Sequence, residues 1–225
     1  MRDMHCHILP GVDDGARDLD ESLAMLAAAR AAGIDEIVCT PHCRSPWFDY
    51  DAMWAAYNLL VDHAADTAAG VLPDGSPLPI RMGFEVNHTK LMGLGYRWID
   101  YVAFSDTDEF LLELDTRCTA YDFEQYKRSI FEIQGHGFQV IIAHPERYMA
   151  IQEDISLARE LVEMGCVLQA STDFVAGGRF GRELKPAKRL LKEGLYTYFA
   201  SDAHNVGHYA CFTEAHQKFG QFLDE

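Results

Sequence analysis

The chain has 225 residues, and 35 acidic against 19 basic side chains give it a formal net charge of -16 at pH 7. Nucleic acid held through its phosphates needs a basic surface, so this balance disfavours a nucleic-acid-binding protein. No apolar run reaches the roughly 18 residues of a transmembrane helix. The opening residues MRDMHCH form neither a basic nor an apolar stretch. We therefore expect no signal peptide and a cytoplasmic protein.

The cysteines are scattered and follow no C-x-x-C spacing that would indicate a zinc site or a disulfide framework. In a chain without secretory features, this pattern predicts reduced thiols. The six residues are Cys6, Cys39, Cys43, Cys118, Cys166 and Cys211.

Short apolar or β-branched runs alternate with amphipathic helical patterns along the chain. The seven predicted strands are 2–7, 35–40, 80–84, 110–114, 139–143, 166–170 and 197–201. The predicted helices are 19–32, 51–69, 122–135, 155–165 and 184–193, several of which end at a glycine. The third strand is followed only by a short polar stretch over 87–95.

Alternating strands and helices with nearly continuous apolar strands predict a parallel sheet covered by helices. Seven such units allow a closed barrel of the TIM type or an open doubly wound sheet. No G-x-G-x-x-G follows the first strand, which disfavours dinucleotide binding. The chain has no internal repeat, and 71–79 is typical of a surface loop, so we expect residues 1–225 to form one domain.

Six of the seven predicted strands carry a histidine or a carboxylate at or just beyond their carboxyl ends. In an α/β barrel those ends meet at one rim, where the chemistry takes place. The first strand contributes two imidazoles that alternate on one face. The residues, in chain order, are His5, His7, His42, Glu85, Glu113, His144, Asp202 and His204.

A single histidine such as His42 or His144 is more often a core residue than a ligand. The recurrence of such residues at six strand ends favours a shared metal site instead. Glu85 and Glu113 lie within apolar runs, where an unpaired carboxylate is costly and needs a cation. Imidazole and carboxylate donors suit manganese, iron or zinc. Because the donors are too many for one ion, we expect two or three ions, with Glu85 able to bridge two.

The motifs DMHCH, TPH, a glutamate after the third strand, AHPERY and SDAHN occur in this order over nearly the whole chain. This series resembles the polymerase and histidinol phosphatase (PHP) superfamily. More narrowly, HILPGVDDGA, TPH, LLEL, AHPERY and SDAHN resemble the metal-dependent tyrosine-protein phosphatases of bacterial capsule and exopolysaccharide loci. The resemblance implies an α/β fold with a distorted seven-stranded (β/α)7 TIM-like barrel of the PHP type, and three metals, commonly manganese.

Matching the motifs residue by residue implies three sets of ligands. The first metal would be held by His5, His7, Glu85 and Asp202, the second by Glu85, Glu113 and His144, and the third by Asp14, His42 and His204. Asp13 is the alternative to Asp14 in the third set. Asp14 is preferred because the family's carboxylate precedes a glycine, which here is Gly15.

The resemblance also implies a phosphate-binding arginine. Arg147 in HPER matches that residue, and its planar fork of donors suits a phosphate. The family often continues past SDAHN into a stretch with an arginine and prolines, whereas this chain reads NVGHYACF and has His208 near the arginine's position. His208 and Arg44 are further candidates to assist at the phosphate.

A thiol-based phosphatase is the first mechanistic alternative, because HC occurs at Cys6 and Cys43. The HC-x5-R loop of such enzymes needs an arginine six positions after the cysteine, and those positions hold Val12 and Asp49. Neither segment fits, so both cysteines are interpreted as small packing residues.

The implied activity is a metal-dependent phosphomonoesterase that uses a metal-bound hydroxide on phosphotyrosine. The implied partner is an autophosphorylated bacterial tyrosine kinase that controls polysaccharide synthesis. One alternative is a small-molecule phosphatase of the histidinol-phosphate type. Another is a catalytically weak regulator that binds a phosphorylated protein, which His208 in place of arginine keeps open. A polymerase-associated nuclease is disfavoured by the acidity.

Overall fold

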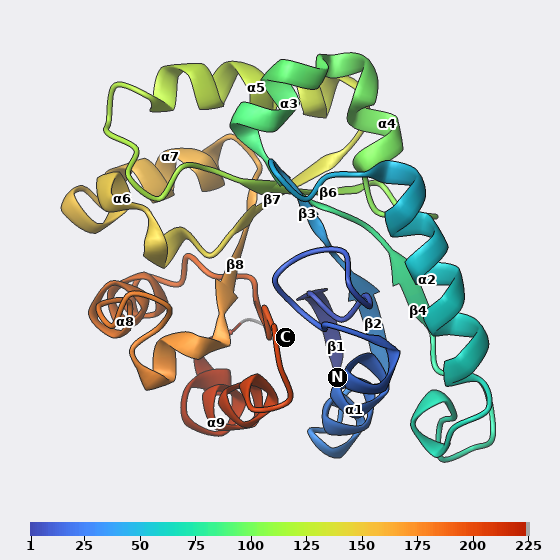
Figure 1. Cartoon of the computed structure of the whole chain (residues 1–225). Coiled ribbons are helices and arrows are strands. Elements are labelled where there is room, and N and C mark those ends of the chain that lie inside the picture. Colours follow the sequence, from blue (N-terminus) through green and yellow to red (C-terminus); the bar gives the residue numbers. More distant parts are fainter. Residues whose placement is uncertain (224–225) are drawn as a thin grey trace.

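The computed structural model describes residues 1–223 and shows parallel strands curled around a common interior with helices outside them (Figure 1). The strands are β1 Arg2–Cys6, β2 Glu36–Cys39, β3 His42–Cys43, β4 Ile80–Met82, β5 Glu85–Asn87, β6 Glu109–Glu113, β7 Gln139–Ala143, β8 Val167–Ser171 and β9 Tyr198–Ala200. The helices are α1 Leu19–Ala31, α2 Tyr50–Ala64, α3 His88–Leu94, α4 Ile99–Val102, α5 Phe123–Gly135, α6 Met149–Glu153, α7 Ser156–Glu163, α8 Leu184–Lys192 and α9 His208–Phe219. Short 3-10 turns are η1 Ala68–Gly70, η2 Tyr96–Trp98, η3 Pro145–Arg147, η4 Thr172–Ala176 and η5 Gly220–Phe222.

All strand pairings are parallel, and they form two sheets in the orders β1-β2-β4 and β3-β5-β6-β7-β8-β9. This confirms the α/β class and the parallel sheet. The described residues contain nine strands where the sequence predicts seven, because the second and third predicted strands each continue after a short break. One break contains Gly83, where an added Cβ would lie only 2.3 Å from Cδ1 of Phe104.

The curl of the sheets brings the last strand beside the first. The backbone amide of Asp202, just after β9, donates to the carbonyl of His5 at 2.8 Å. The amide of His7 donates to the carbonyl of Ala203 at 2.9 Å. Residues from the two ends of the chain therefore meet at the same rim.

The predicted helices are confirmed with shifted ends. The pattern over 51–69 forms α2, which stops at Ala64, and the turn η1 follows it. Asp18 and Asp49 cap α1 and α2 by accepting hydrogen bonds from backbone amides of the first turns. The polar stretch over 87–95 folds as the short helix α3, and α9 follows the last strand.

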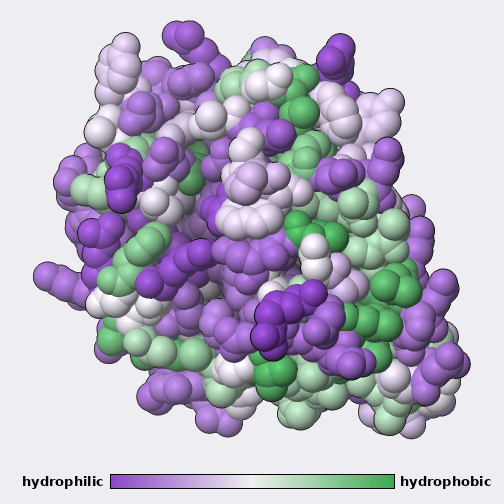
Figure 2. Space-filling model, viewed as in Figure 1, coloured by the Kyte–Doolittle hydropathy of each residue, from purple (hydrophilic) through white to green (hydrophobic). Residues whose placement is uncertain are grey.

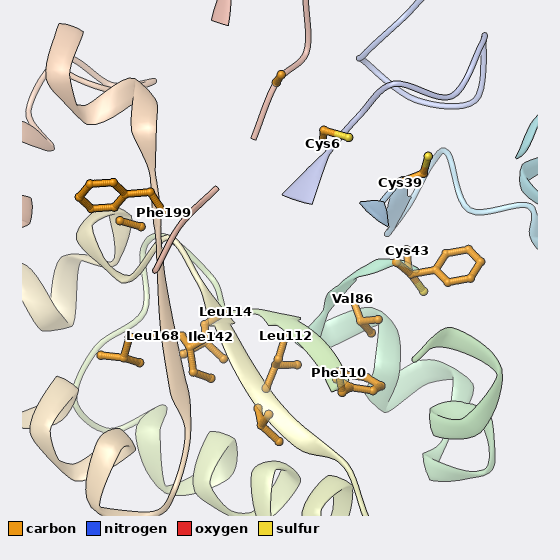
Figure 3. Packing of buried hydrophobic residues seen from close by; sticks show 14 of the residues in the cluster. Cys6, Cys39, Cys43, Val86, Phe110, Leu112, Leu114, Ile142, Leu168 and Phe199 are labelled. Carbon is orange, nitrogen blue, oxygen red and sulfur yellow. The ribbon is translucent and has the colours of Figure 1, made fainter. Parts of the chain in front are cut away.

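Alternation along the strands separates two apolar layers. Phe110 and Leu112 of β6 and Ile142 of β7 belong to the large cluster that includes the helices' inner faces (Figure 3). Leu111 and Ile141, on the opposite faces of the same strands, belong to a smaller cluster inside the curl. Glu113 shares a face with Leu111, so the interior turns from apolar to charged toward the carboxyl ends of the strands.

None of the helices within residues 1–223 combines the length and the apolar character needed to cross a membrane.

Candidate metal centre

The structure brings all nine predicted metal ligands together at the carboxyl ends of the strands. Their donor atoms form three groups, and within each group the atoms lie within 4.8 Å of one another. The groups are His5, His7 and Asp202; Glu85, Glu113 and His144; and His7, Asp14, His42 and His204. Figure 2 shows hydrophilic residues gathered over the middle of the molecule, within the ring of strands in Figure 1.

The first group contains two imidazoles, and hydrogen bonds to their Nδ1 atoms hold the two rings in place. Nε2 of His5 and Nε2 of His7 are 3.3 Å apart, and they lie 3.4 and 3.3 Å from Oδ1 of Asp202. Nδ1 of His5 hydrogen-bonds Gln169, and Nδ1 of His7 hydrogen-bonds Asp13, at 2.9 and 2.8 Å. Metal-binding histidines commonly use their other ring nitrogen in this way, which leaves Nε2 free for the ion.

The carboxylate Glu85 lies between the first two groups. Its Oε1 is 3.5 Å from Nε2 of His5 and 2.8 Å from Nε2 of His144. Its Oε2 is 3.7 Å from Nε2 of His7. This position suits the bridging role that the sequence suggests for Glu85.

The two neighbouring aspartates of the first loop have different surroundings. Asp13 accepts hydrogen bonds from the backbone amides of Gly15 and His42, in addition to its contact with an imidazole. Oδ1 of Asp14 lies 2.9 Å from Nε2 of His42 and 3.5 Å from Nε2 of His204. Asp14 thus lies with two other predicted ligands, whereas Asp13 contacts the far side of the His7 ring and the backbone; which of the two is a ligand stays a prediction.

The backbone is strained where two of the donors leave their strands. His144 has φ 35° and Asp202 has φ 48°, and Asp106 is the remaining non-glycine residue with positive φ among residues 1–223. Such conformations cost about 1–3 kcal/mol each and gather at functional sites. The backbone at Gly15 also packs closely against that of His7, because an added Cβ would lie 2.0 Å from the carbonyl oxygen of His7.

Unsatisfied donor atoms provide the test of whether these residues fit a metal. Buried polar atoms normally have hydrogen-bond partners. Within the described part of the chain, five nitrogen or oxygen atoms of the nine residues form no hydrogen bond: Nδ1 of His42, Oε2 of Glu85, Nδ1 of His144, Oδ1 of Asp202 and Nε2 of His204. The first two of these atoms lie 2.5 Å from each other. Imidazole nitrogens and carboxylate oxygens are ligands for divalent transition metals, so the set fits such ions.

The electrostatics of the site also favour a cation. Burial raises the pKa of Glu113 to about 7, and the nearby charge of Glu85 contributes to the increase. Burial alone would lower the pKa of His5, but Asp202 and Glu85 raise it to about 9. Burial would also raise the pKa of Glu85, yet His42 and His5 hold it well below its usual range. The buried carboxylates thus demand positive charge nearby.

Arg147 is buried beside the centre and faces acidic residues. Its Nη2 lies 2.6 Å from Oδ2 of Asp202 in an ion pair, and it donates hydrogen bonds to Asp173 and Ser171 at 3.0 Å each. Its Nε is one of the buried atoms without a partner among the described residues. Arg147 therefore orients one candidate ligand, and its phosphate-binding role stays a prediction.

Two cavities flank the centre. One of about 410 Å³ contains His208 and Cys211 in its lining, and one of about 320 Å³ contains Arg44 and Phe180. Arg147 and Arg179 line both cavities, and Arg44 also lines the smaller one, so two guanidinium groups line one cavity and three line the other.

Arg179 was missed by the sequence reasoning. Its side chain is 43% exposed, and its Nη2 donates to Asp14 at 3.1 Å. The sixth predicted strand is the one that contributes no histidine or carboxylate, but the run GGRFG soon follows it. An arginine in a glycine-rich loop at a strand's carboxyl end is the signal that could have identified this residue.

His208 and Arg44 lie at opposite sides of the centre. Nδ1 of His208 accepts a hydrogen bond from the backbone amide of His204 at 3.2 Å. Arg44 is 3.3 Å from Glu113 and 2.9 Å from Nε2 of His42. Both line a cavity, and their assistance to a phosphate stays a prediction.

The cysteines have the character of packing residues. All six are free, and five are buried. Burial raises the pKa of Cys43 to about 12, which disfavours the thiolate that a thiol-based phosphatase would need.

A curled parallel α/β sheet with buried imidazoles and carboxylates at its rim and arginines beside them defines a metal-dependent hydrolase for phosphorylated substrates. Comparison with known proteins gives the particular family. The chain belongs to the capsular polysaccharide synthesis family CpsB/CapC, which it matches over residues 1–220.

Relatives of this chain include named phosphatases. It is 34% identical over 208 residues to the tyrosine-protein phosphatase YwqE of Bacillus subtilis, which covers 92% of this chain and 78% of YwqE. It is 30% identical over 211 residues to the tyrosine-protein phosphatase CpsB of Streptococcus pneumoniae, covering 92% and 84%. The fold also resembles a solved structure from a study of YwqE of Bacillus subtilis and CpsB of Streptococcus pneumoniae, which are described as unique metal-dependent tyrosine phosphatases. That match has a TM-score of 0.78 and 31% identity, and covers 98% of this chain and 88% of the other.

Proposed function

We propose that this protein is a metal-dependent tyrosine-protein phosphatase. The observation that carries the proposal is the convergence of nine imidazole and carboxylate side chains from distant segments, several with unpartnered donor atoms, at one rim. Its family and its relatives' activities support the same function. The substrate would be a phosphotyrosine protein, such as a bacterial tyrosine kinase that regulates capsular or exopolysaccharide synthesis, in the cytoplasm.

The donor groups support a centre of two or three divalent ions. Manganese is the ion that the family resemblance implies, and the same mixed nitrogen and oxygen ligands would also accept iron or zinc. The first set would be His5, His7, Glu85 and Asp202, the second Glu85, Glu113 and His144, and the third Asp14, His42 and His204. When bound, such ions act as Lewis acids that neutralise phosphate charge and activate water near neutral pH.

The chain's own arginines would orient the substrate. Arg147 and Arg179 line both cavities, so they would bind phosphate oxygens and hold the phosphorus in line for attack. Arg44 lines one of these cavities and His208 the other, so each would assist at a phosphate bound in its own cavity. The phenolate of tyrosine leaves readily because its pKa is about 10, so a dedicated general acid is less necessary.

The fold proposed with this function is a single domain with a distorted seven-stranded PHP-type barrel. Only Thr40 and Pro41 separate β2 from β3, and only Gly83 and Phe84 separate β4 from β5. The amide of Gly83 donates to the carbonyl of Cys39, which keeps the broken segments side by side. Counting each broken pair as one strand gives seven, and the contacts between β9 and β1 support closure.

The test compares metal content and phosphotyrosine hydrolysis in the wild type, His144→Ala and His88→Gln. His88 is a buried histidine outside the nine donors, so it is a matched control. We expect His144→Ala to stay folded by circular dichroism, lose metal and lose at least about 100-fold in turnover. His88→Gln should keep both properties. Normal turnover by His144→Ala would contradict the proposal.

Two alternative activities are resolved with the same preparations. Faster turnover of histidinol phosphate than of a phosphotyrosine peptide would indicate a small-molecule phosphatase. Tight phosphopeptide binding without phosphate release by the metal-loaded protein would indicate a regulator.

A further inference from the structure

A second cavity extends the site away from the candidate metal ligands. The cavity of about 320 Å³ next to Glu113 and His144 shares Arg44 and Asn87 with a neighbouring cavity of about 550 Å³. Because the two share these residues, they are neighbours, and the two cavities together are called the groove below. The outer cavity is also lined by Ser45, Thr89, Lys90, Gly93 and Leu94.

The outer cavity has a charge opposite to that of the whole chain. Its ionisable lining residues are Arg44 and Lys90, and no carboxylate lines it. The whole chain, in contrast, carries 35 acidic and 19 basic residues. A basic surface on so acidic a protein would attract an anionic partner to this place.

The two cations of the outer cavity differ in their partners: Lys90 is unpaired within the described residues, whereas Arg44 faces carboxylates of the candidate metal centre. Lys90 forms no ion pair within residues 1–223, and its Nζ lies 5.1 Å from the centre of the Phe48 ring. Arg44 lies 5.0 Å over the Trp47 ring, and its acidic neighbours are Glu113 and Asp14, at 3.3 and 3.8 Å. Those two carboxylates belong to the candidate metal centre, so bound cations would leave Arg44 more positive toward the groove.

We propose that this groove binds the peptide segment beside the phosphotyrosine and selects acidic residues there. The inference rests on the proposed function, because a phosphotyrosine at the metal centre places its flanking residues in the adjoining cavity. The lining cations would attract aspartate or glutamate side chains of the peptide. Salt screens charges at the surface, so this attraction would act only on residues close to the phosphotyrosine. The groove thus determines which phosphotyrosine peptides are preferred, whereas the residues at the rim carry out the hydrolysis.

The experiment measures kcat and KM for free phosphotyrosine and for three phosphotyrosine peptides of equal length with acidic, neutral or basic flanks. The wild type is compared with Lys90→Met, Lys90→Glu and the control Lys192→Glu. Lys192 is an exposed lysine at the end of α8, which lies in a different part of the ring from α3 (Figure 1). The control therefore makes the same change in net charge outside the groove.

We expect the wild type at low salt to prefer the acidic peptide over the neutral one by about 3- to 10-fold in kcat/KM, mainly through KM. Lys90→Met should weaken this preference and Lys90→Glu should remove or reverse it, while Lys192→Glu keeps it. Turnover of free phosphotyrosine should stay unchanged in all variants, which also shows that they fold. Added salt should reduce the wild-type preference.

Two results would overturn the inference while the proposed function stands. One is equal turnover of the three peptides by a wild type that hydrolyses free phosphotyrosine. The other is an equal effect of Lys90→Glu and Lys192→Glu on the acidic peptide. A wild type that hydrolyses no phosphotyrosine in any form would reject the proposed function and this inference together.

Discussion

Charged side chains are exposed to solvent at the amino ends of the parallel strands and buried at the carboxyl ends. At the amino ends, Glu36 of β2 pairs with Arg81 and lies 4.0 Å from Arg2, whose side chain is 65% exposed. At the carboxyl ends, Glu85 and Asp202 are 1% and 3% exposed and lie among imidazoles. The amino ends thus combine opposite charges in contact with solvent, whereas the carboxyl ends bury carboxylates.

The difference shows why a metal is needed at one end only. Exposed ion pairs are balanced by solvent and contribute about 0–1 kcal/mol. Buried carboxylates lose their hydration, and a single buried arginine, Arg147, faces Asp202. Without an ion, protonated imidazoles such as that of His5, whose pKa is raised to about 9, supply the opposite charge, and bound divalent ions would take the place of those protons.

Removal of metal should have the largest effect and act only at the carboxyl ends. We expect chelation to lower phosphotyrosine turnover by at least about 100-fold, with recovery on addition of Mn²⁺. Loss of ions at 100 times their dissociation constant also removes about 2.7 kcal/mol of stability, which lowers Tm. Activity assays and thermal unfolding of the same samples provide the measurement. Unchanged turnover in metal-stripped protein would contradict the comparison.

A buried histidine outside the metal centre should affect stability alone. Burial lowers the pKa of His88 to about 4 from 6.5, and its Nε2 lies 2.8 Å from Oγ of Ser129. Between these pKa values the unfolded chain binds a proton that the folded chain does not. The free energy of unfolding therefore falls as pH decreases from about 6.5 to 4, by up to roughly 3 kcal/mol.

The measurement is urea unfolding of wild type and His88→Gln at several pH values, with chelator present to remove metal effects. The difference between the two proteins isolates this histidine from other titrating groups. We expect the variant to show the shallower decrease below pH 6.5. Parallel curves for the two proteins would exclude a neutral, buried His88.

The sequence predicts which side chains meet at the rim, because nearly all of them end or follow an apolar run and parallel strands bring those ends together. It does not predict that these strands continue beyond the breaks after β2 and β4, and the break after β4 lies where Phe104 closely approaches Gly83. Arg179 was missed because its place at the rim depends on a tertiary contact, the ion pair of its Nη2 with Asp14. Its loop itself is held locally, because buried Glu183 accepts hydrogen bonds from the backbone amides of Phe180 and Arg182.

Asp13→Asn tests the positioning of an imidazole. The carboxylate accepts from Nδ1 of His7, and the loss of such a partner typically weakens metal affinity by about 10- to 100-fold. Titration of the metal-stripped variant with Mn²⁺, followed by activity and calorimetry, measures the affinity. Asp18→Asn makes the same change in the same segment at the start of α1 and should have no effect. Equal Mn²⁺ affinities of the two variants would show that Asp13 does not position His7 for metal binding.

Arg179→Ala tests the arginine that the sequence reasoning missed. Loss of one guanidinium contact to phosphate should raise KM for phosphotyrosine by about tenfold, with a smaller change in kcat. Arg182→Ala is the control, because Arg182 lies in the same loop and packs 5.7 Å from the centre of the Phe180 ring. Steady-state kinetics and competition by inorganic phosphate provide the readout. Identical kinetics in both variants would assign the phosphate to other residues.

Glu36→Gln should have the smallest effect, because it removes a carboxylate at the solvated ends of the strands. Its side chain is 23% exposed and has two arginine neighbours, so we expect a loss of at most about 1 kcal/mol, reduced further by salt. Metal content and turnover should match those of the wild type. Glu85→Gln makes the same chemical change at the buried ends and should lose metal and activity. Similar losses in the two variants would show that burial at the rim does not distinguish the ends of these strands.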